Sequence, residues 1–145
     1  MRLPCSSARH HDRGVAINFY PSQGMVLICD FRGTVMPEIC KIRPVVIVSP
    51  PSVRRPMLST IVPLSTTPPR VVRSCHFRLR SPPYEAARGE IWAKCDLIMS
   101  VSHRRLSHVR LGDRLAVGWV GADELKAIRI AAAASFGVDV VQGAL

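Results

Sequence analysis

Lysine and acidic residues are scarce in this sequence. Of its 145 residues, 20 are basic and 10 are acidic, and among the basic ones only Lys41, Lys94 and Lys126 are lysines. The formal net charge is therefore +10, and nearly all of it is carried by arginine. The arginine bias also fits a GC-rich genome, but the sign of the charge predicts a polyanionic partner such as RNA, DNA, an acidic protein or anionic lipid.

Long apolar runs and signal-like segments are missing as well. No apolar run approaches the roughly 20 residues that a membrane-spanning helix needs. The arginines near the N-terminus are not followed by an apolar segment, so no secretory signal is predicted. We therefore expect a cytoplasmic protein with no membrane partner.

The sequence also lacks the motifs that hold metals, nucleotides and many catalytic nucleophiles. The cysteines are scattered without a C-x-x-C pair or metal-finger spacing, and no glycine-rich phosphate loop or nucleophile elbow is present. We expect no metal and no cofactor. Cys29 and Cys95 lie in apolar strands and are expected to behave as small buried hydrophobes.

The apolar pattern predicts a single, mainly β domain with some helix. Runs rich in β-branched residues and bounded by proline, glycine or serine indicate strands, and the last segment has a helix-forming composition. The expected strands are 25–31, 45–48, 58–64 and 76–80, with a further apolar segment at 91–101, and the expected helix is 123–136. Residues 1–18 show no periodicity and are expected to form a flexible leader, followed by one domain at 19–145. A small, strongly twisted β-barrel with a C-terminal helix is the architecture that fits these elements.

Charged residues gather just before the second expected strand. Glu38, Lys41 and Arg43 lie on the loop side of Pro44, and the β-branched run that follows fits a strand buried on both faces. An arginine held at the mouth of such a strand presents fixed donors to two phosphate oxygens and keeps its charge at any physiological pH. The alternative is a surface salt bridge between Arg43 and Glu38.

Hydroxyls and more cations follow the third expected strand. Ser65 and Thr66 stand directly after it. Farther along the chain, His76 and Arg78 alternate with apolar residues, which predicts a half-exposed strand with one basic face. That face either follows the backbone of a single-stranded nucleic acid or is an ordinary solvated surface, and His76 is either a phosphate contact or a structural residue.

A cation and a carboxylate also lie two residues apart in the segment 91–101. An extended strand would project Lys94 and Asp96 from the same face.

Taken in order, these segments resemble the MazF/PemK toxins of bacterial type II toxin–antitoxin modules. The resemblance is carried by MVLICDF at 25–31, PEICKIRPVVIVSP at 37–50, VPLST at 62–66 and AKCDLIMSVSHRRL at 93–106. It implies an SH3-like barrel that forms a homodimer, cleaves single-stranded RNA without a metal, and is neutralised by an antitoxin, which we expect to be acidic where it meets the basic site.

The resemblance also implies roles for particular residues. Arg43 matches the family's catalytic arginine and Glu38 the acidic residue that precedes it. Ser65 stands where many members have a catalytic threonine, and Thr66 is an alternative for the same role.

Lys94 and Asp96 match the arginine and aspartate of the R-C-D motif found in PemK-type members, with lysine in place of arginine. The chemistry needs a base for the 2′-hydroxyl, a cation for the phosphorane and an acid for the departing 5′-oxygen. Glu38 and Asp96 are both candidates for the base, and Lys41, Lys94, His76 and Arg78 are candidates for substrate binding.

Two alternatives remain open from the sequence. A catalytically degenerate homologue would bind RNA or an antitoxin without cutting, because the change from arginine to lysine loses bidentate geometry. A gyrase-directed toxin of the same fold would depend instead on a tryptophan near the C-terminal helix, and Trp119 lies just ahead of the expected helix.

Overall fold

The computed structural model describes residues 14–140. The strands, in chain order, are β1 (Met25–Asp30), β2 (Ile42–Ile47), β3 (Leu58–Ser65), β4 (His76–Arg78), β5 (Trp92–Lys94), β6 (Met99–Ser102), β7 (Leu106–Ser107), β8 (Val109–Leu111), β9 (Arg114–Ala116) and β10 (Gly118–Trp119). Short 3-10 turns occur at η1 (Pro51–Val53), η2 (Cys95–Leu97) and η3 (His103–Arg105), and the helix α1 spans Ala122–Ser135. No helix within the described residues is both long and apolar enough to cross a membrane.

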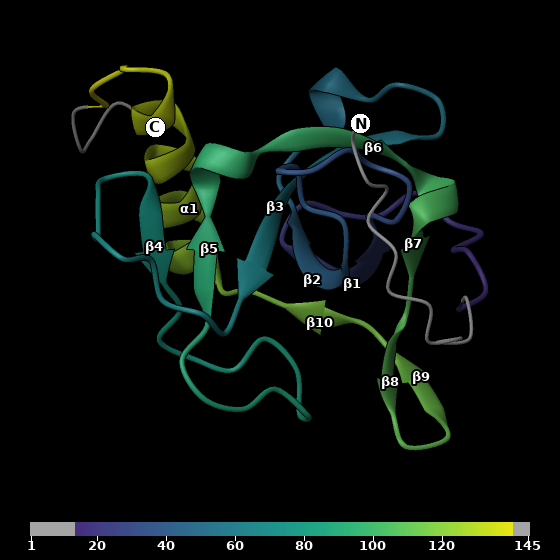
Figure 1. The fold of residues 1–145 in the computed structure, drawn as a ribbon. Helices are drawn as coiled ribbons and strands as arrows, with labels where there is room; N and C mark the ends of the chain where they lie inside the picture. The colour runs from purple at the N-terminus through teal and green to yellow at the C-terminus, as the bar shows by residue number, and fades with distance from the viewer. Residues whose placement is uncertain (1–13, 141–145) are drawn as a thin grey trace.

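Most of the strands form one curved antiparallel sheet, a half-barrel with the order β10-β1-β2-β3-β5-β4. β7 also pairs with β1, and β6 also pairs with β3. The long strand β3 pairs with β6 through its first half and with β5 at its C-terminal end, so the sheet bends around it. Figure 1 shows α1 beside β4 and β5 at one side of this sheet, with the β8–β9 hairpin extending from the other.

The central strands are buried on both faces because successive side chains point to opposite sides of a strand. In β2, Val46 belongs to one hydrophobic cluster, while Val45 and Ile47 belong to another. The first cluster lies between the sheet and α1, where Ile128 is fully buried. The expectation of a strand buried on both faces is thus confirmed for 45–47.

The C-terminal helix forms close to its expected bounds. Asp123 and Glu124 lie in its first turn, where negative charge favours the helix dipole. Glu124 is also buried, and its carboxylate accepts a hydrogen bond from the backbone N–H of Arg80, which ties the helix to the chain after β4. Gly137 follows the helix with φ of +75°, a conformation that suits glycine at a helix end.

Several sequence expectations need correction. The segment 91–101 is not one strand: β5 ends at Lys94, η2 follows, and β6 begins at Met99, because β5 and β6 pair with different parts of β3. Asp96 therefore lies in a 3-10 turn, and the argument that alternation along one strand places it with Lys94 was wrong. Arg43 lies within β2, opposite Cys29, and not in the preceding loop.

Part of the expected N-terminal leader belongs to the fold. Ala16 forms a bridge with Ser107, and Ile17 is buried and donates its N–H to the carbonyl of Leu106 at 3.0 Å. The first 13 residues of the expected leader lie outside the described residues.

Candidate active site

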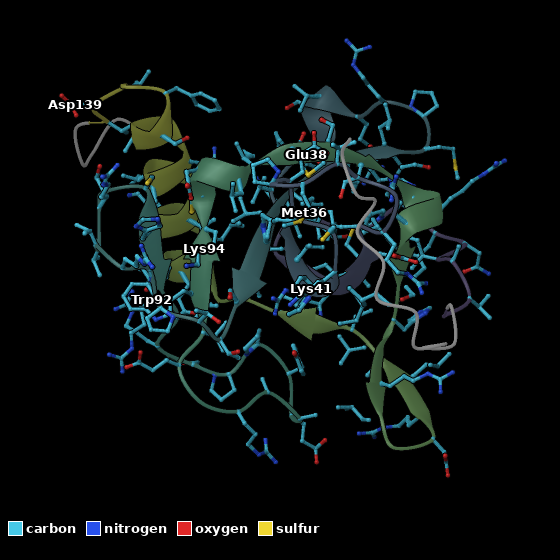
Figure 2. All side chains as sticks on the ribbon, viewed as in Figure 1. Met36, Glu38, Lys41, Trp92, Lys94 and Asp139 are labelled. Atoms are coloured by element: carbon cyan, nitrogen blue, oxygen red, sulfur yellow. The ribbon has the colours of Figure 1, made fainter. Side chains whose placement is uncertain are left out.

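A surface cavity of about 390 Å³ gathers most of the residues that the sequence suggested for catalysis and binding. It lies between the loop that joins β1 to β2 and the C-terminal ends of β3 and β5. Its charged and hydroxyl-bearing lining residues are Glu38, Lys41, Arg43, Ser65, His76, Lys94 and Asp96. Figure 2 shows Glu38, Lys41 and Met36 on one side of the site and Lys94 on β5 on the other. Of the candidates, only Thr66 and Arg78 do not line this cavity.

Arg43 reaches the cavity from a paired strand, β2. Its strand pairs with β1 at Cys29, and Pro44 follows it in the same ladder. Within residues 14–140, no ion pair joins Arg43 to Glu38, so the salt-bridge alternative is not what the structure shows. The guanidinium fork is therefore available to hold two oxygens of an anionic ligand.

Ser65 ends β3 beside Arg43. Its Oγ accepts a hydrogen bond from the backbone N–H of Thr67 at 3.1 Å, which leaves the hydroxyl hydrogen to donate to a ligand. Thr66 is exposed and lines a neighbouring hollow of about 300 Å³, which Arg43 and Ser65 also border. Of the two hydroxyl residues, only Ser65 lines both spaces, so the geometry favours it over Thr66 as the hydroxyl next to Arg43.

Glu38 is oriented by a tight turn of its own loop. The backbone N–H of Glu38 donates to the carbonyl of Val35 at 2.9 Å, and the N–H of Val35 donates to Oε2 of Glu38 at 3.1 Å. The peptide bond between Met36 and Pro37, inside this turn, is cis. One carboxylate oxygen is thus engaged by the backbone, and the other remains for the cavity.

His76 and Asp96 face each other on the opposite wall. The backbone N–H of Arg73 donates to Nδ1 of His76 at 3.0 Å, so the proton of the neutral ring resides on Nε2. That Nε2 lies 3.6 Å from Oδ1 of Asp96, and the His76 side chain is only 10% exposed. Lys94 is directly opposite His76 in the pairing of β4 and β5. A carboxylate, an imidazole and an ammonium group therefore converge there.

Arg78, expected to contact the substrate, is engaged elsewhere: its guanidinium forms an ion pair with Glu90 at 3.1 Å. Glu90 also accepts a hydrogen bond from the indole N–H of Trp92 at 3.3 Å. Trp92 lies between Ser65 and Arg78 in the strand register, so it shares the face that carries Ser65. We did not single out Trp92 from the sequence, although its position two residues before Lys94 was a usable signal.

The buried cysteines take no part in this chemistry. Burial raises the pKa of both Cys29 and Cys95 to about 12, so these thiols stay protonated near neutral pH. The expectation that they act as small hydrophobes is confirmed.

Comparisons with known proteins identify the family of this chain. A family model described as "PemK-like, MazF-like toxin of type II toxin-antitoxin system" matches residues 22–136. No curated protein matches the chain.

Among solved structures, an endoribonuclease in complex with its cognate antitoxin from a mycobacterial species is 23% identical, with a TM-score of 0.60 over 84% of this chain and 100% of that one. MazF from Deinococcus radiodurans is 17% identical, with a TM-score of 0.63 over 83% of this chain and 100% of that one. The Mycobacterium tuberculosis toxin MazF-mt6 is 19% identical, with a TM-score of 0.56 over 79% and 98%. These likenesses confirm the expected mainly β, SH3-like fold with a C-terminal helix, in which the sheet forms a half-barrel. Because the family model spans most of the sequence, the chain belongs to the PemK-like, MazF-like toxins of type II toxin–antitoxin systems.

Proposed function

We propose that this toxin is an endoribonuclease that cleaves single-stranded RNA without a metal ion, through attack of a 2′-hydroxyl on the adjacent phosphate. The observation that carries the proposal is the cavity in which Arg43, Ser65, Lys94 and two carboxylates meet. Membership of the family and the solved structures described as endoribonucleases support it. The products would be fragments that end in a 2′,3′-cyclic phosphate and fragments that begin with a 5′-hydroxyl.

Arg43 would stabilise the phosphorane. Negative charge grows on the non-bridging oxygens as the 2′-oxygen attacks, and a guanidinium on a paired strand can hold two of these oxygens with little reorganisation. The hydroxyl of Ser65 would donate a further hydrogen bond to the same group. Removing one preorganised donor of this kind costs about 3 to 4 kcal/mol.

We assign the role of the base to Asp96 and keep Glu38 as the competing candidate. Asp96 faces the Nε2–H of His76, and that ring is fixed by the backbone of Arg73, so His76 is a positioning residue for the carboxylate. Glu38 already uses one oxygen to hold its own loop. If Asp96 is the base, Asp96→Asn should lower kcat far more than Glu38→Gln, and the reverse order would transfer the role to Glu38.

Lys94 would protonate the departing 5′-oxygen. It lines the same cavity and lies beside the pair formed by His76 and Asp96. An ammonium group releases its proton more readily than a guanidinium, so lysine at this position can serve as an acid, which favours an active enzyme over a degenerate binder. Lys41, also in the cavity, would bind phosphate.

The proposed partners follow from charge and from the family. With a net charge of +10, the protein is expected to bind an acidic cognate antitoxin in the cytoplasm. We also propose a homodimer, because the paired strands β3 and β6 each carry an exposed large apolar side chain, Leu58 and Met99, that suits contact with a second copy.

Expression in a bacterial host tests the proposal. The wild-type chain should arrest growth and reduce intact mRNA, whereas Arg43→Ala should be harmless although its circular dichroism and solubility are unchanged. Trp119→Ala should stay toxic, since Trp119 lies on β10 and does not line the cavity. Toxicity that survives Arg43→Ala but disappears with Trp119→Ala would support the gyrase-directed alternative, and a harmless wild type would support the degenerate binder.

A further inference from the structure

Cys75, His76 and Asp96 form a mixed cluster of potential metal ligands beside the proposed active site. One ligand atom from each residue, a sulfur, a ring nitrogen and a carboxylate oxygen, lies within 4.8 Å of the other two. Two segments supply them: Cys75 directly precedes β4 and His76 begins it, while Asp96 belongs to η2. The segments are joined by a backbone hydrogen bond from the N–H of Cys95 to the carbonyl of Cys75 at 3.1 Å, so the cluster sits on a fixed frame.

The ligand types and spacing suit zinc. Zinc takes sulfur, nitrogen and oxygen ligands at about 2.0 to 2.3 Å, so two ligands of one tetrahedral ion lie roughly 3.3 to 3.7 Å apart. His76 Nε2 and Asp96 Oδ1, at 3.6 Å, already have this separation. The sulfur of Cys75 lies within 4.8 Å of both other ligand atoms, so it needs to approach by roughly 1.3 Å at most. Cys75 adjoins the exposed residues of the loop before β4.

The surroundings select against other cations. A surface hollow contains Cys75, His76 and Asp96, and Arg70 and Arg73 also line it, so a cation held only by charge would be repelled. Magnesium and calcium prefer several oxygen ligands, and Asp96 is the only carboxylate in the cluster. A thiolate and an imidazole bind borderline and soft metals through stronger bonds. The hollow, with a volume of about 710 Å³, gives a metal ion a path from solvent and leaves room for a water as the fourth ligand.

We propose that Cys75, His76 and Asp96 bind one zinc ion, and that the bound ion stops RNA cleavage. The inhibitory part rests on the proposed function, because His76 and Asp96 also line the candidate active site. A carboxylate that ligates zinc can no longer accept the 2′-hydroxyl proton. Zinc would therefore act as an inhibitor of a metal-independent enzyme, and a chelator would restore activity.

Binding redistributes two protons. The thiol of Cys75 releases its proton to solvent and becomes the thiolate ligand. Zinc takes the place of the proton on His76 Nε2, so the single proton of the neutral ring moves to Nδ1. The hydrogen bond from the Arg73 N–H to Nδ1 is then lost. Because Arg73 lies in an exposed part of the loop, its N–H can donate to water instead.

The direct test measures binding without reference to RNA. The full-length, reduced, metal-free protein is titrated with zinc chloride and followed by native mass spectrometry, then with cobalt chloride, whose thiolate complexes absorb in the near ultraviolet. We expect one zinc per chain and a thiolate-to-cobalt band. Cys75→Ala should lose the band and weaken zinc binding by roughly tenfold or more, while Ser74→Ala, an exposed neighbour, should bind like the wild type.

Zinc binding and a cobalt band that persist unchanged in Cys75→Ala would overturn the site, as would a wild type that binds no zinc. Cys75→Ala lies outside the catalytic groups, so it should cleave RNA normally in EDTA and remain active at a zinc concentration that inhibits the wild type. Equal inhibition of the two would overturn the inhibitory role. A protein that binds zinc through Cys75 but cuts no RNA in EDTA would refute the proposed function and uphold the site.

Discussion

Separate replacement of Ser65 and of Thr66 by alanine tests which hydroxyl contacts the reacting phosphate. Ser65 Oγ accepts the Thr67 N–H, so its own hydrogen is free for a ligand, and it lines both hollows beside Arg43. A hydrogen bond to a charged group contributes about 1.5 to 3 kcal/mol. Ser65→Ala should therefore slow the chemical step by roughly 10- to 150-fold. The loss of the turn hydrogen bond should cost only about 0.5 to 1 kcal/mol of stability.

Thr66→Ala is the matched control. Thr66 is exposed and borders only the second hollow, so its rate should stay within about twofold of the wild type. The assay is single-turnover cleavage of a short labelled RNA at saturating enzyme, which isolates the chemical step from binding. The reasoning would be refuted if Thr66→Ala slowed cleavage more than Ser65→Ala did.

Three further predictions concern binding and stability. Trp92→Ala should weaken binding of a single-stranded RNA by about 1 to 3 kcal/mol if a base stacks on the face that carries Ser65. Fluorescence anisotropy measures the affinity, and an equal loss of affinity in Trp119→Ala, on β10, would contradict the prediction. Burial lowers the pKa of His103 below its ordinary value of 6.5, so as the pH falls the imidazole ring is protonated in the unfolded chain before it is protonated in the folded protein. The contribution of His103 to the free energy of unfolding is complete above that value and declines below it. Urea titrations at several pH values should show that the free energy of unfolding falls less with decreasing pH in His103→Gln than in the wild type. An identical pH dependence in the two proteins would count against the buried neutral ring. Glu124→Ala leaves the Arg80 N–H without its acceptor and should lower the free energy of unfolding by about 1 to 3 kcal/mol, measured by urea unfolding. An unchanged urea midpoint would contradict this prediction.

The regular elements were predictable because their signals are local. The β-branched run from Val45 to Val48 fits a strand buried on both faces, and the composition before Gly137 fits the helix that forms as Ala122–Ser135. The break inside 91–101 was not predictable in this way. It arises because β3 is longer than either partner and pairs with β5 and β6 in turn, which is a property of the sheet and not of the segment.

The site was partly predictable for a similar reason. The resemblance to MazF/PemK toxins supplied Arg43, Ser65 and Asp96, which the fold brings to one cavity. The ion pair between Arg78 and Glu90 could not be foreseen, because the two side chains lie at opposite ends of the loop between β4 and β5 and meet only in the folded structure. Likewise, sequence spacing gave no sign of the ligand cluster. The sequence separation between Cys75 or His76 and Asp96 matches no known metal-binding motif, and only the pairing of β4 with β5 brings the three residues together.

Cleavage of RNA by the purified protein in EDTA tests the central claim most directly. A long single-stranded RNA is incubated with the wild type, with Arg43→Ala and with Arg129→Ala, which removes an exposed arginine of α1. We predict fragments ending in a 2′,3′-cyclic phosphate from the wild type and from Arg129→Ala, and a rate several hundred-fold lower for Arg43→Ala, as expected from a loss of about 3 to 4 kcal/mol. Equal cleavage by Arg43→Ala, or none by the wild type, would contradict the account.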